Sequence, residues 1–207
     1  GRLEAAAGRL VPLAHFAAPD VESLAATKEG GFVVLGSTSY DGGYSTNDLV
    51  AFDASGQRRF ALGGDQGDPE DEGSLFAPEA LAVLASGEFV LLDNIRHLLQ
   101  FYSEGGEFLY ALELEQAWGR EPSYPSEVMA DPDGGVIVHD FNGTPPIVRM
   151  DREGKVLAEF QPHHPDGGTF RLRSGVQAGP GGALWTSDGQ ALLRLDVSGR
   201  VSSVLGP

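Results

Sequence analysis

The chain has 207 residues, of which 41% are apolar, and this is enough for one domain with a buried core. It carries 30 acidic and 14 basic residues, and a formal net charge of −16 repels the phosphates of nucleic acids and of anionic membranes. Cysteine is absent, which excludes disulfides, thiolate metal sites and cysteine nucleophiles.

The first predicted elements are two strands within residues 1–16. Two short patterns there, Arg2-Leu3-Glu4 and Gly8-Arg9-Leu10-Val11, return near the other end as Arg194-Leu195-Asp196 and Gly199-Arg200-Val201. We therefore expect residues 1–16 to form the two outer strands of a sheet whose other two strands are missing. The chain begins at Gly1 rather than Met, so we expect it to have been processed or cut from a longer polypeptide.

Further along, a glycine-led apolar motif returns four times at intervals of 47 to 57 residues. The four copies are Gly30–Leu35, Gly87–Asp93, Gly134–Asp140 and Gly182–Asp188. Each copy is followed by an apolar run and a glycine-containing turn: Asp53–Gly56, Ser103–Gly106, Asp151–Gly154 and Asp196–Gly199. This period, built from short strands and glycine turns, is typical of propeller blades.

The sequence thus predicts an all-β protein, a β-propeller of four-stranded antiparallel blades. We place the blades at 21–64, 78–114, 125–160 and 170–207, all in a single domain over 1–207. The second strand of each blade, for example Phe89–Leu92, is apolar at every position, which predicts burial on both faces. Residues 1–16 are either half of a further blade in a ring of five or six, which we favour, or a flap on a compact four-bladed ring.

The second repeat resembles an NHL repeat. The resemblance is carried by Gly73-Ser-Leu-Phe-Ala-Pro-Glu, then Gly87-Glu-Phe-Val-Leu-Leu-Asp-Asn, then Leu99–Leu109 with its Ser-Glu-Gly-Gly turn. The other repeats match more loosely, since Gly36 replaces the aspartate in the first and the fourth lacks the proline. The resemblance implies a six-bladed-type propeller. NHL proteins and their neighbours include protein-binding scaffolds, RNA-binding propellers, an amidating lyase and metal-dependent lactonases.

The acidic charge is opposite to the basic face that the RNA-binding members use. A lactonase of this kind would need Glu, Asn and Asp at one mouth of the channel. Glu22 and Glu79 open inner strands and Asn94 and Asn142 are available, but the Glu-Gly-Pro opening of those enzymes is absent. The histidine set of the lyase cannot be assembled from this chain, and no catalytic residue is assigned.

Three groups of polar residues have simple structural interpretations. Asp93, Asp140 and Asp188 end the second strand of three blades, so we expect them to hold turns through side-chain to backbone hydrogen bonds. His139 ends a buried strand and is expected to be a hydrogen-bonded structural histidine. The acidic loop 65–73 is expected to be a solvated connection, with a weak Ca²⁺ site as the alternative. Otherwise we expect no cofactor.

Long loops with aromatic side chains are the predicted binding surface. We expect loops at 37–47 and 116–125, because Tyr, Trp and Arg are enriched at binding hot spots and loops on rigid scaffolds often carry function. For Trp118 the alternative is that it fills the groove between two blades. The candidate partner-binding residues are Tyr40, Tyr44, Trp118, Arg120, Tyr124, His163 and His164.

The predicted function is therefore a non-enzymatic binding or scaffolding propeller. We expect a protein partner or a larger complex in a periplasmic or secreted setting, no nucleic-acid partner, and no direct membrane insertion, since no apolar run approaches the roughly 20 residues of a membrane span. The alternative is a metal-dependent hydrolase or lyase, lactonase-like or amidating-lyase-like, with one divalent cation at the channel mouth.

Overall fold

The computed structural model describes residues 3–6, 9–12, 20–40, 44–63, 71, 73–164, 167–169, 175–179, 183–187, 191–196 and 199–205. Within these residues the fold is all-β apart from one short helix, α1 (Leu114–Trp118). An N-terminal hairpin pairs β1 (Leu3–Ala6) with β2 (Arg9–Pro12). No helix of the described residues has the length and apolar character that crossing a membrane requires.

Four antiparallel sheets follow, each of four strands in chain order. The first contains β3 (Asp20–Ala26), β4 (Phe32–Tyr40), β5 (Tyr44–Phe52) and β6 (Arg58–Gly63). The second contains β7 (Pro78–Val83), β8 (Phe89–Asp93), β9 (Leu98–Tyr102) and β10 (Phe108–Glu113). The third contains β11 (Pro125–Ala130), β12 (Val136–Asp140), β13 (Ile147–Met150) and β14 (Val156–Phe160). The fourth contains β15 (Gln177–Ala178), β16 (Leu184–Ser187), β17 (Leu192–Leu195) and β18 (Val201–Leu205).

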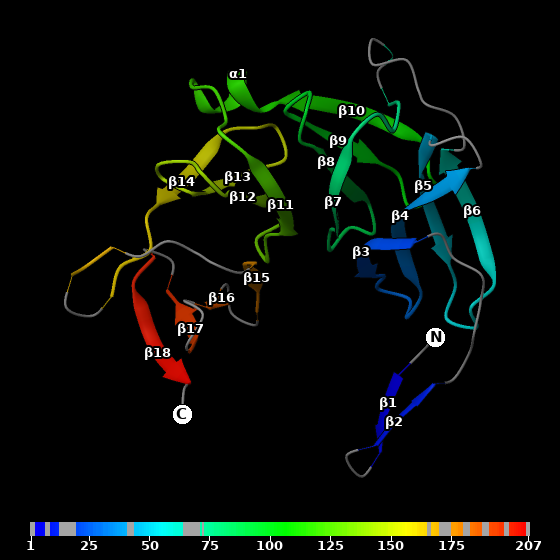
Figure 1. The fold of residues 1–207 in the computed structure, drawn as a ribbon, viewed down its shortest axis with the longest axis horizontal. Coiled ribbons are helices and arrows are strands. Elements are labelled where there is room, and N and C mark those ends of the chain that lie inside the picture. Colours follow the sequence, from blue (N-terminus) through cyan, green and yellow to red (C-terminus); the bar gives the residue numbers. More distant parts are fainter. Residues whose placement is uncertain are drawn as a thin grey trace.

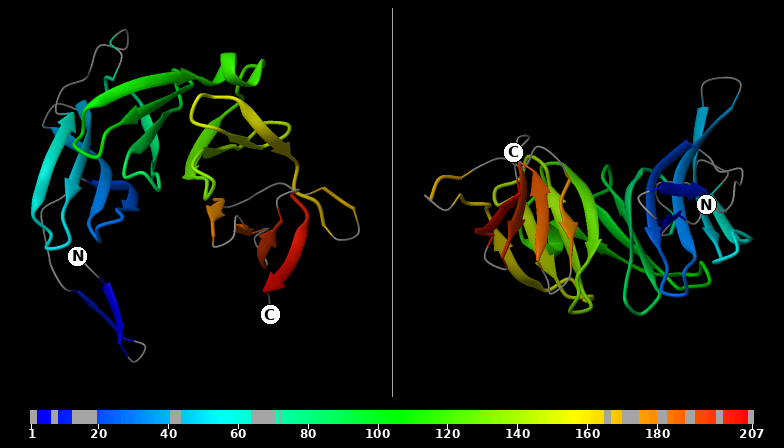
Figure 2. Two further views of the ribbon diagram at one scale, coloured as in Figure 1. Left: turned by 180° about the vertical axis from the view of Figure 1, so that it is seen from behind. Right: turned by 90° about the horizontal axis from the view of Figure 1, so that it is seen from below.

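The sheets stand side by side in an arc around a central space (Figure 1). Their first strands, β3, β7, β11 and β15, face that space, while β6, β10, β14 and β18 lie outside (Figures 1 and 2). The β1–β2 hairpin lies apart from the four sheets, near the open side of the arc (Figure 1). This is the propeller arrangement that the repeats predict, with each four-stranded sheet as one blade.

The core lies between neighbouring blades, because the second strand of a blade is covered on both faces. Every residue of β8 and of β12 is buried. Phe89 and Leu91 pack toward the first blade, while Val90 and Leu92 pack toward the third. Full burial of such a side chain is worth about 1.5–3 kcal/mol. The continuous apolar run of each second strand is therefore what fixes one blade against the next.

The segment 37–47 is a correction to the sequence-based expectation. The sequence predicts a long loop there, but β4 and β5 continue as a paired hairpin in register from Phe32↔Phe52 to Tyr40↔Tyr44. Thr and Tyr have good strand propensity and the two arms pair residue for residue, so the ladder extends beyond the blade. Figure 2 shows this hairpin reaching past the neighbouring sheets. Similarly, part of the predicted loop 116–125 belongs to α1, which ends at Gly119 with φ 65°.

Candidate binding site at the centre of the propeller

A cavity of about 690 Å³ lies where the inner strands meet. It is lined by residues of β3, β7 and β11 and by 176–178 of the fourth blade. The polar lining residues are Glu22, Ser23, Glu79, Ser126, Glu127 and Gln177. None of the described lining residues is basic. Cavities of this size suit a small ligand or a few side chains of a protein partner.

Three equivalent β-bulges place polar side chains at one end of this cavity. The regular pairing with the second strand is interrupted at the second residue of β7 and of β11 and at the third residue of β3, so that Glu79, Ser126 and Glu22 are the extra residues. A bulge leaves its extra residue out of the ladder and changes the direction of its side chain. The bulges recur in three neighbouring blades and lie at one end of the cavity. We call this end the mouth.

Two carboxylates meet at the mouth. Burial, together with the negative charge of Glu22, raises the pKa of Glu79 above its usual value. The Asn94 side-chain amide donates a hydrogen bond of 3.0 Å to Oε2 of Glu79. Glu22, Glu79 and Asn94 are three of the four residues that the sequence offers for a channel mouth. The fourth, Asn142, is an exposed residue of the turn after β12.

A third carboxylate, Glu127, connects the mouth to the fourth blade. Its Oε2 accepts a 2.7 Å hydrogen bond from the backbone N–H of Val176 and lies 3.5 Å from Nδ1 of His139. His139 is only 2% exposed, yet neither ring nitrogen has a hydrogen-bond partner in the part of the chain that the structure describes. The expected burial of His139 is therefore correct, but the expected hydrogen bonds are not found among the described residues, where the ring packs against the Phe141 ring and the Glu127 carboxylate of its own blade.

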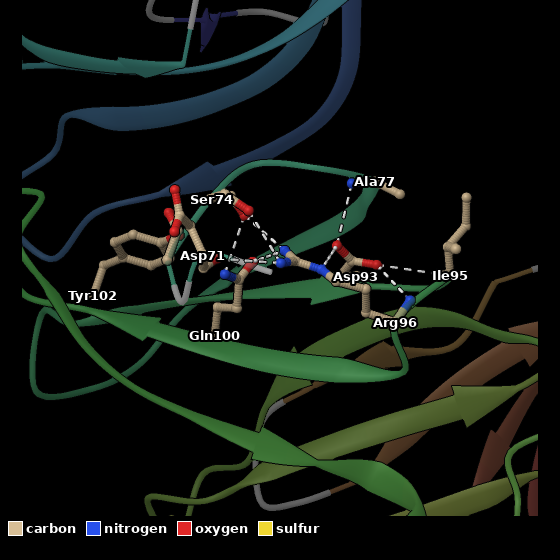
Figure 3. A network of polar contacts seen from close by, with 9 residues as sticks. Asp71, Ser74, Ala77, Asp93, Ile95, Arg96, Gln100 and Tyr102 are labelled. Carbon is tan, nitrogen blue, oxygen red and sulfur yellow. Dashed lines mark hydrogen bonds and ion pairs between the residues drawn. The ribbon is translucent and has the colours of Figure 1, made fainter. Parts of the chain in front are cut away.

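The turn beside Glu79 is held by a buried polar network (Figure 3). Asp93 accepts hydrogen bonds from the backbone N–H groups of Ala77, Ile95 and Arg96, and the Arg96 guanidinium pairs with it at 2.8 Å. Arg96 also donates to the Ser74 carbonyl. The network thus ties the segment that leads into β7 to the turn that follows β8.

The third blade repeats this device. Asp140 accepts hydrogen bonds from the backbone N–H groups of Ser123 and Tyr124, directly before β11. The role predicted for Asp93 and Asp140 is confirmed, whereas Asp188 lies outside the described residues. Arg120 lies 3.5 Å from Asp140, donates to the Pro145 carbonyl and stacks on the Trp118 ring at 4.9 Å.

The structure separates the other predicted site residues. Trp118 is 9% exposed and belongs to the core between the second and third blades, as in the groove-filling alternative. His163 and His164 make backbone contacts with Gly199 and Gly168 in the connection to the fourth blade, away from the cavity lining. Tyr40 and Tyr44 end the described part of the β4–β5 hairpin, and their side chains lie outside the description. Most of the acidic loop 65–73 does as well.

Exposed apolar side chains lie at the same end of the blades as the mouth, and only one of them is a candidate from the sequence. Val21, Ile95, Tyr124 and Phe141 are 57%, 67%, 45% and 49% exposed. All four lie where inner strands begin or second strands end, which is the end of the blades that carries Glu22 and Glu79. We call these four residues the rim. Of the rim residues, only Tyr124 is among the residues that the sequence predicts to bind a partner. Ile95 and Phe141 share a sequence signal that could have identified them, an apolar residue one or two positions after a strand-ending aspartate.

The raised pKa of Glu79 predicts that its charge destabilises the folded chain. A carboxyl group whose pKa is higher in the folded state favours folding at low pH, and this benefit is lost as the pH rises through the folded-state value. We expect Glu79→Gln, which can keep the bond from Asn94, to raise the free energy of unfolding at pH 7 by less than about 1 kcal/mol, since the group is well exposed.

Urea titrations at pH 7 and near pH 4 measure this effect, and the gain should shrink at the lower pH. Glu107→Gln, on an exposed turn at the other end of the second blade, is the control and should leave stability unchanged. Two results would contradict the prediction that Glu22 and Glu79 repel each other. One is an equal change in the free energy of unfolding for the two substitutions, and the other is a loss of stability at pH 7 in Glu79→Gln.

Comparison with known proteins supports the fold. No protein-family model matches the chain, and no curated protein matches it. Among solved structures, the chain resembles a streptogramin B lyase with 16% identity over 93% of this chain and 71% of that one, at a TM-score of 0.52. A nidogen/laminin complex matches with 13% identity, 99% and 89% coverage and a TM-score of 0.53.

A candidate exported protein of Bacteroides fragilis matches with 15% identity, 94% and 52% coverage and a TM-score of 0.56. At these identities the likeness extends to the fold alone. Neighbours of this fold include both a lyase and a component of a protein complex. Together with the four sheets and their order, these matches show that the chain has a β-propeller fold.

Proposed function

We propose that the chain is a non-enzymatic binding module that holds a partner at the mouth of its central cavity. The observation that carries the proposal is the coincidence of the cavity, the bulged carboxylates and the exposed rim at one end of the blades. Among the described residues, no three His, Asp or Glu side chains gather closely enough to hold a metal ion. The partner is a protein or part of a larger assembly, because a rim of exposed apolar side chains suits a protein surface.

The setting that we propose is extracytoplasmic. The Bacteroides fragilis neighbour supports this, although it shares only the fold. The net charge of −16 argues against a nucleic-acid partner. The NHL resemblance is compatible with a protein-binding role.

Selection of random displayed peptides on the immobilised chain tests the proposal without assuming a ligand. We expect enriched peptides that bind the chain and lose binding to a variant with Ile95→Ser and Glu79→Gln. A variant with Leu109→Ser and Leu157→Ser serves as the control, because it removes two other exposed apolar side chains, on β10 and β14. The proposal is wrong if no peptide is enriched, or if the enriched peptides ignore the mouth.

A metal-dependent hydrolase or lyase is the second candidate, because the repulsion between Glu22 and Glu79 could equally be relieved by a divalent cation. Metal analysis of the purified chain and thermal unfolding with and without chelator separate the two functions. A binding module should contain no stoichiometric metal and unfold at the same temperature in chelator. One bound metal per chain, with a clear loss of stability in chelator, would favour the enzyme.

A further inference from the structure

Building on the proposed binding function, we propose that the partner presents a cationic, apolar protein segment. A lysine or arginine of that segment enters the mouth between Glu22 and Glu79, and its flanking apolar side chains pack on the rim. The inference concerns the chemistry of the partner. The proposed function can stand without it.

The negative charge of the cavity lining favours a cationic partner. Glu22, Glu79 and Glu127 line one cavity, and none of its described lining residues is basic. Burial and, after it, the charge of Glu22 disfavour the charged form of Glu79, so the two carboxylates that line the mouth repel each other. Oε1 of Glu79 accepts no hydrogen bond from the described residues, whereas Oε2 accepts one from Asn94. An ammonium or guanidinium group would relieve the repulsion and use the free oxygen.

An independent observation is the hydrogen-bonding capacity that the site leaves unused. Among the described residues neither buried nitrogen of His139 has a hydrogen-bond partner, although Nδ1 lies 3.5 Å from Oε2 of Glu127, a lining residue of the cavity. Such orphaned polar groups are rare in folded proteins, and each calls for an explanation. Glu127 already accepts a hydrogen bond from Val176, so the carboxylate is fixed in place for a ligand.

The rim argues for a protein segment rather than a free cation. A metal ion or a small polyamine would need the carboxylates but would gain nothing from Val21, Ile95, Tyr124 and Phe141. Ile95 extends away from the polar network beneath it (Figure 3), and its backbone is fixed by Asp93. Tyr124 is fixed in the same way by Asp140. Apolar side chains on a rigid backbone lose little entropy when a partner covers them, which favours binding.

The probe is a fluorescent nine-residue peptide that alternates lysine and leucine, and its binding to the full chain is followed by fluorescence anisotropy. The comparison probes are the same peptide with glutamate in place of lysine, and spermine as a cation without apolar side chains. We expect the lysine peptide to bind and the glutamate peptide not to bind. Affinity should fall as the ionic strength rises from about 0.05 to about 0.3 M, because screening weakens exposed charge pairs.

Matched double variants separate the site from general attraction to an acidic protein. Glu22→Gln with Glu79→Gln should weaken the peptide by about tenfold or more, whereas Glu107→Gln with Glu153→Gln removes the same charge from exposed turns at the other end of the blades and should change little. Likewise, the double variant Ile95→Ser with Phe141→Ser should bind the lysine peptide about fivefold more weakly or worse. The control, Leu109→Ser with Leu157→Ser, should keep its affinity for the peptide.

Two results would overturn the inference even if the lysine peptide binds. One is an equal effect of the two glutamate pairs, which would mean attraction to net charge alone. The other is spermine binding as tightly as the peptide, with no effect of the rim substitutions, which would mean a site for free cations. If the lysine peptide fails while randomly selected peptides still depend on the mouth, the cationic chemistry is wrong and the binding function stands. If neither binds, both are wrong.

Discussion

Asp93→Ala is expected to destabilise the chain by about 3–5 kcal/mol, the usual cost of removing one partner from a buried ion pair. The Asp93 side chain is fully buried, and it accepts hydrogen bonds from three backbone N–H groups as well as from Arg96. Asp93→Ala would remove the acceptor of three backbone N–H groups and the carboxylate that pairs with the Arg96 guanidinium, in a largely buried place. Since domains are commonly stable by 5–15 kcal/mol, this is a large share of the total.

Urea unfolding at pH 7, followed by tryptophan fluorescence, measures the loss. Arg59→Gln is the control because Arg59 forms an exposed ion pair with Glu104 at 3.0 Å, and exposed pairs contribute at most about 1 kcal/mol. Similar losses in the two variants would mean that Asp93 is not the centre of the network. The same variant should also weaken binding at the mouth, because Asp93 holds the turn that carries Ile95.

The role of the strand-ending aspartates could be predicted because it depends on local pattern. Asp93 and Asp140 recur at one place in a repeat, and a short carboxylate after a strand has few options other than nearby backbone N–H groups. The burial of β8 and β12 on both faces was also predictable, since an apolar run without alternation fits only a strand covered twice. The β4–β5 extension was not, because Ser, Thr and Asn are common in both loops and exposed strands.

The candidate site was only half predictable from the sequence. The sequence predicts that Glu22 and Glu79 lie at the start of inner strands. The bulges at these two residues depend on strand register, which cannot be predicted from residue type. Trp118 was drawn into the candidate surface by its residue type, yet its indole donates to the Met150 sulfur inside the core. Composition identifies residues suited to binding, and tertiary packing decides which of them remain exposed.

The paired glycines before β12 lead to the second large prediction, that Gly135→Ala destabilises the chain by about 3 kcal/mol or more. A Cβ on Gly135 would lie 2.0 Å from the Met150 carbonyl oxygen and 3.1 Å from Cα of Asp151. Both atoms belong to backbone, and Met150 pairs with Val136 in the β12–β13 ladder. The added methyl group can therefore be accommodated only by separating two central strands of the third blade.

Gly134→Ala separates this clash from backbone strain. Gly134 has φ 97°, which is unfavourable for alanine, but a Cβ there meets no atom within 4 Å. We expect a loss of about 1–2 kcal/mol, the cost of a left-handed conformation. Urea unfolding of both variants gives the order, and a larger loss for Gly134→Ala would show that the turn, not the close approach of β13, limits this site. Because β12 carries His139 and Asp140 to the mouth, Gly135→Ala should also impair peptide binding more than Gly134→Ala does.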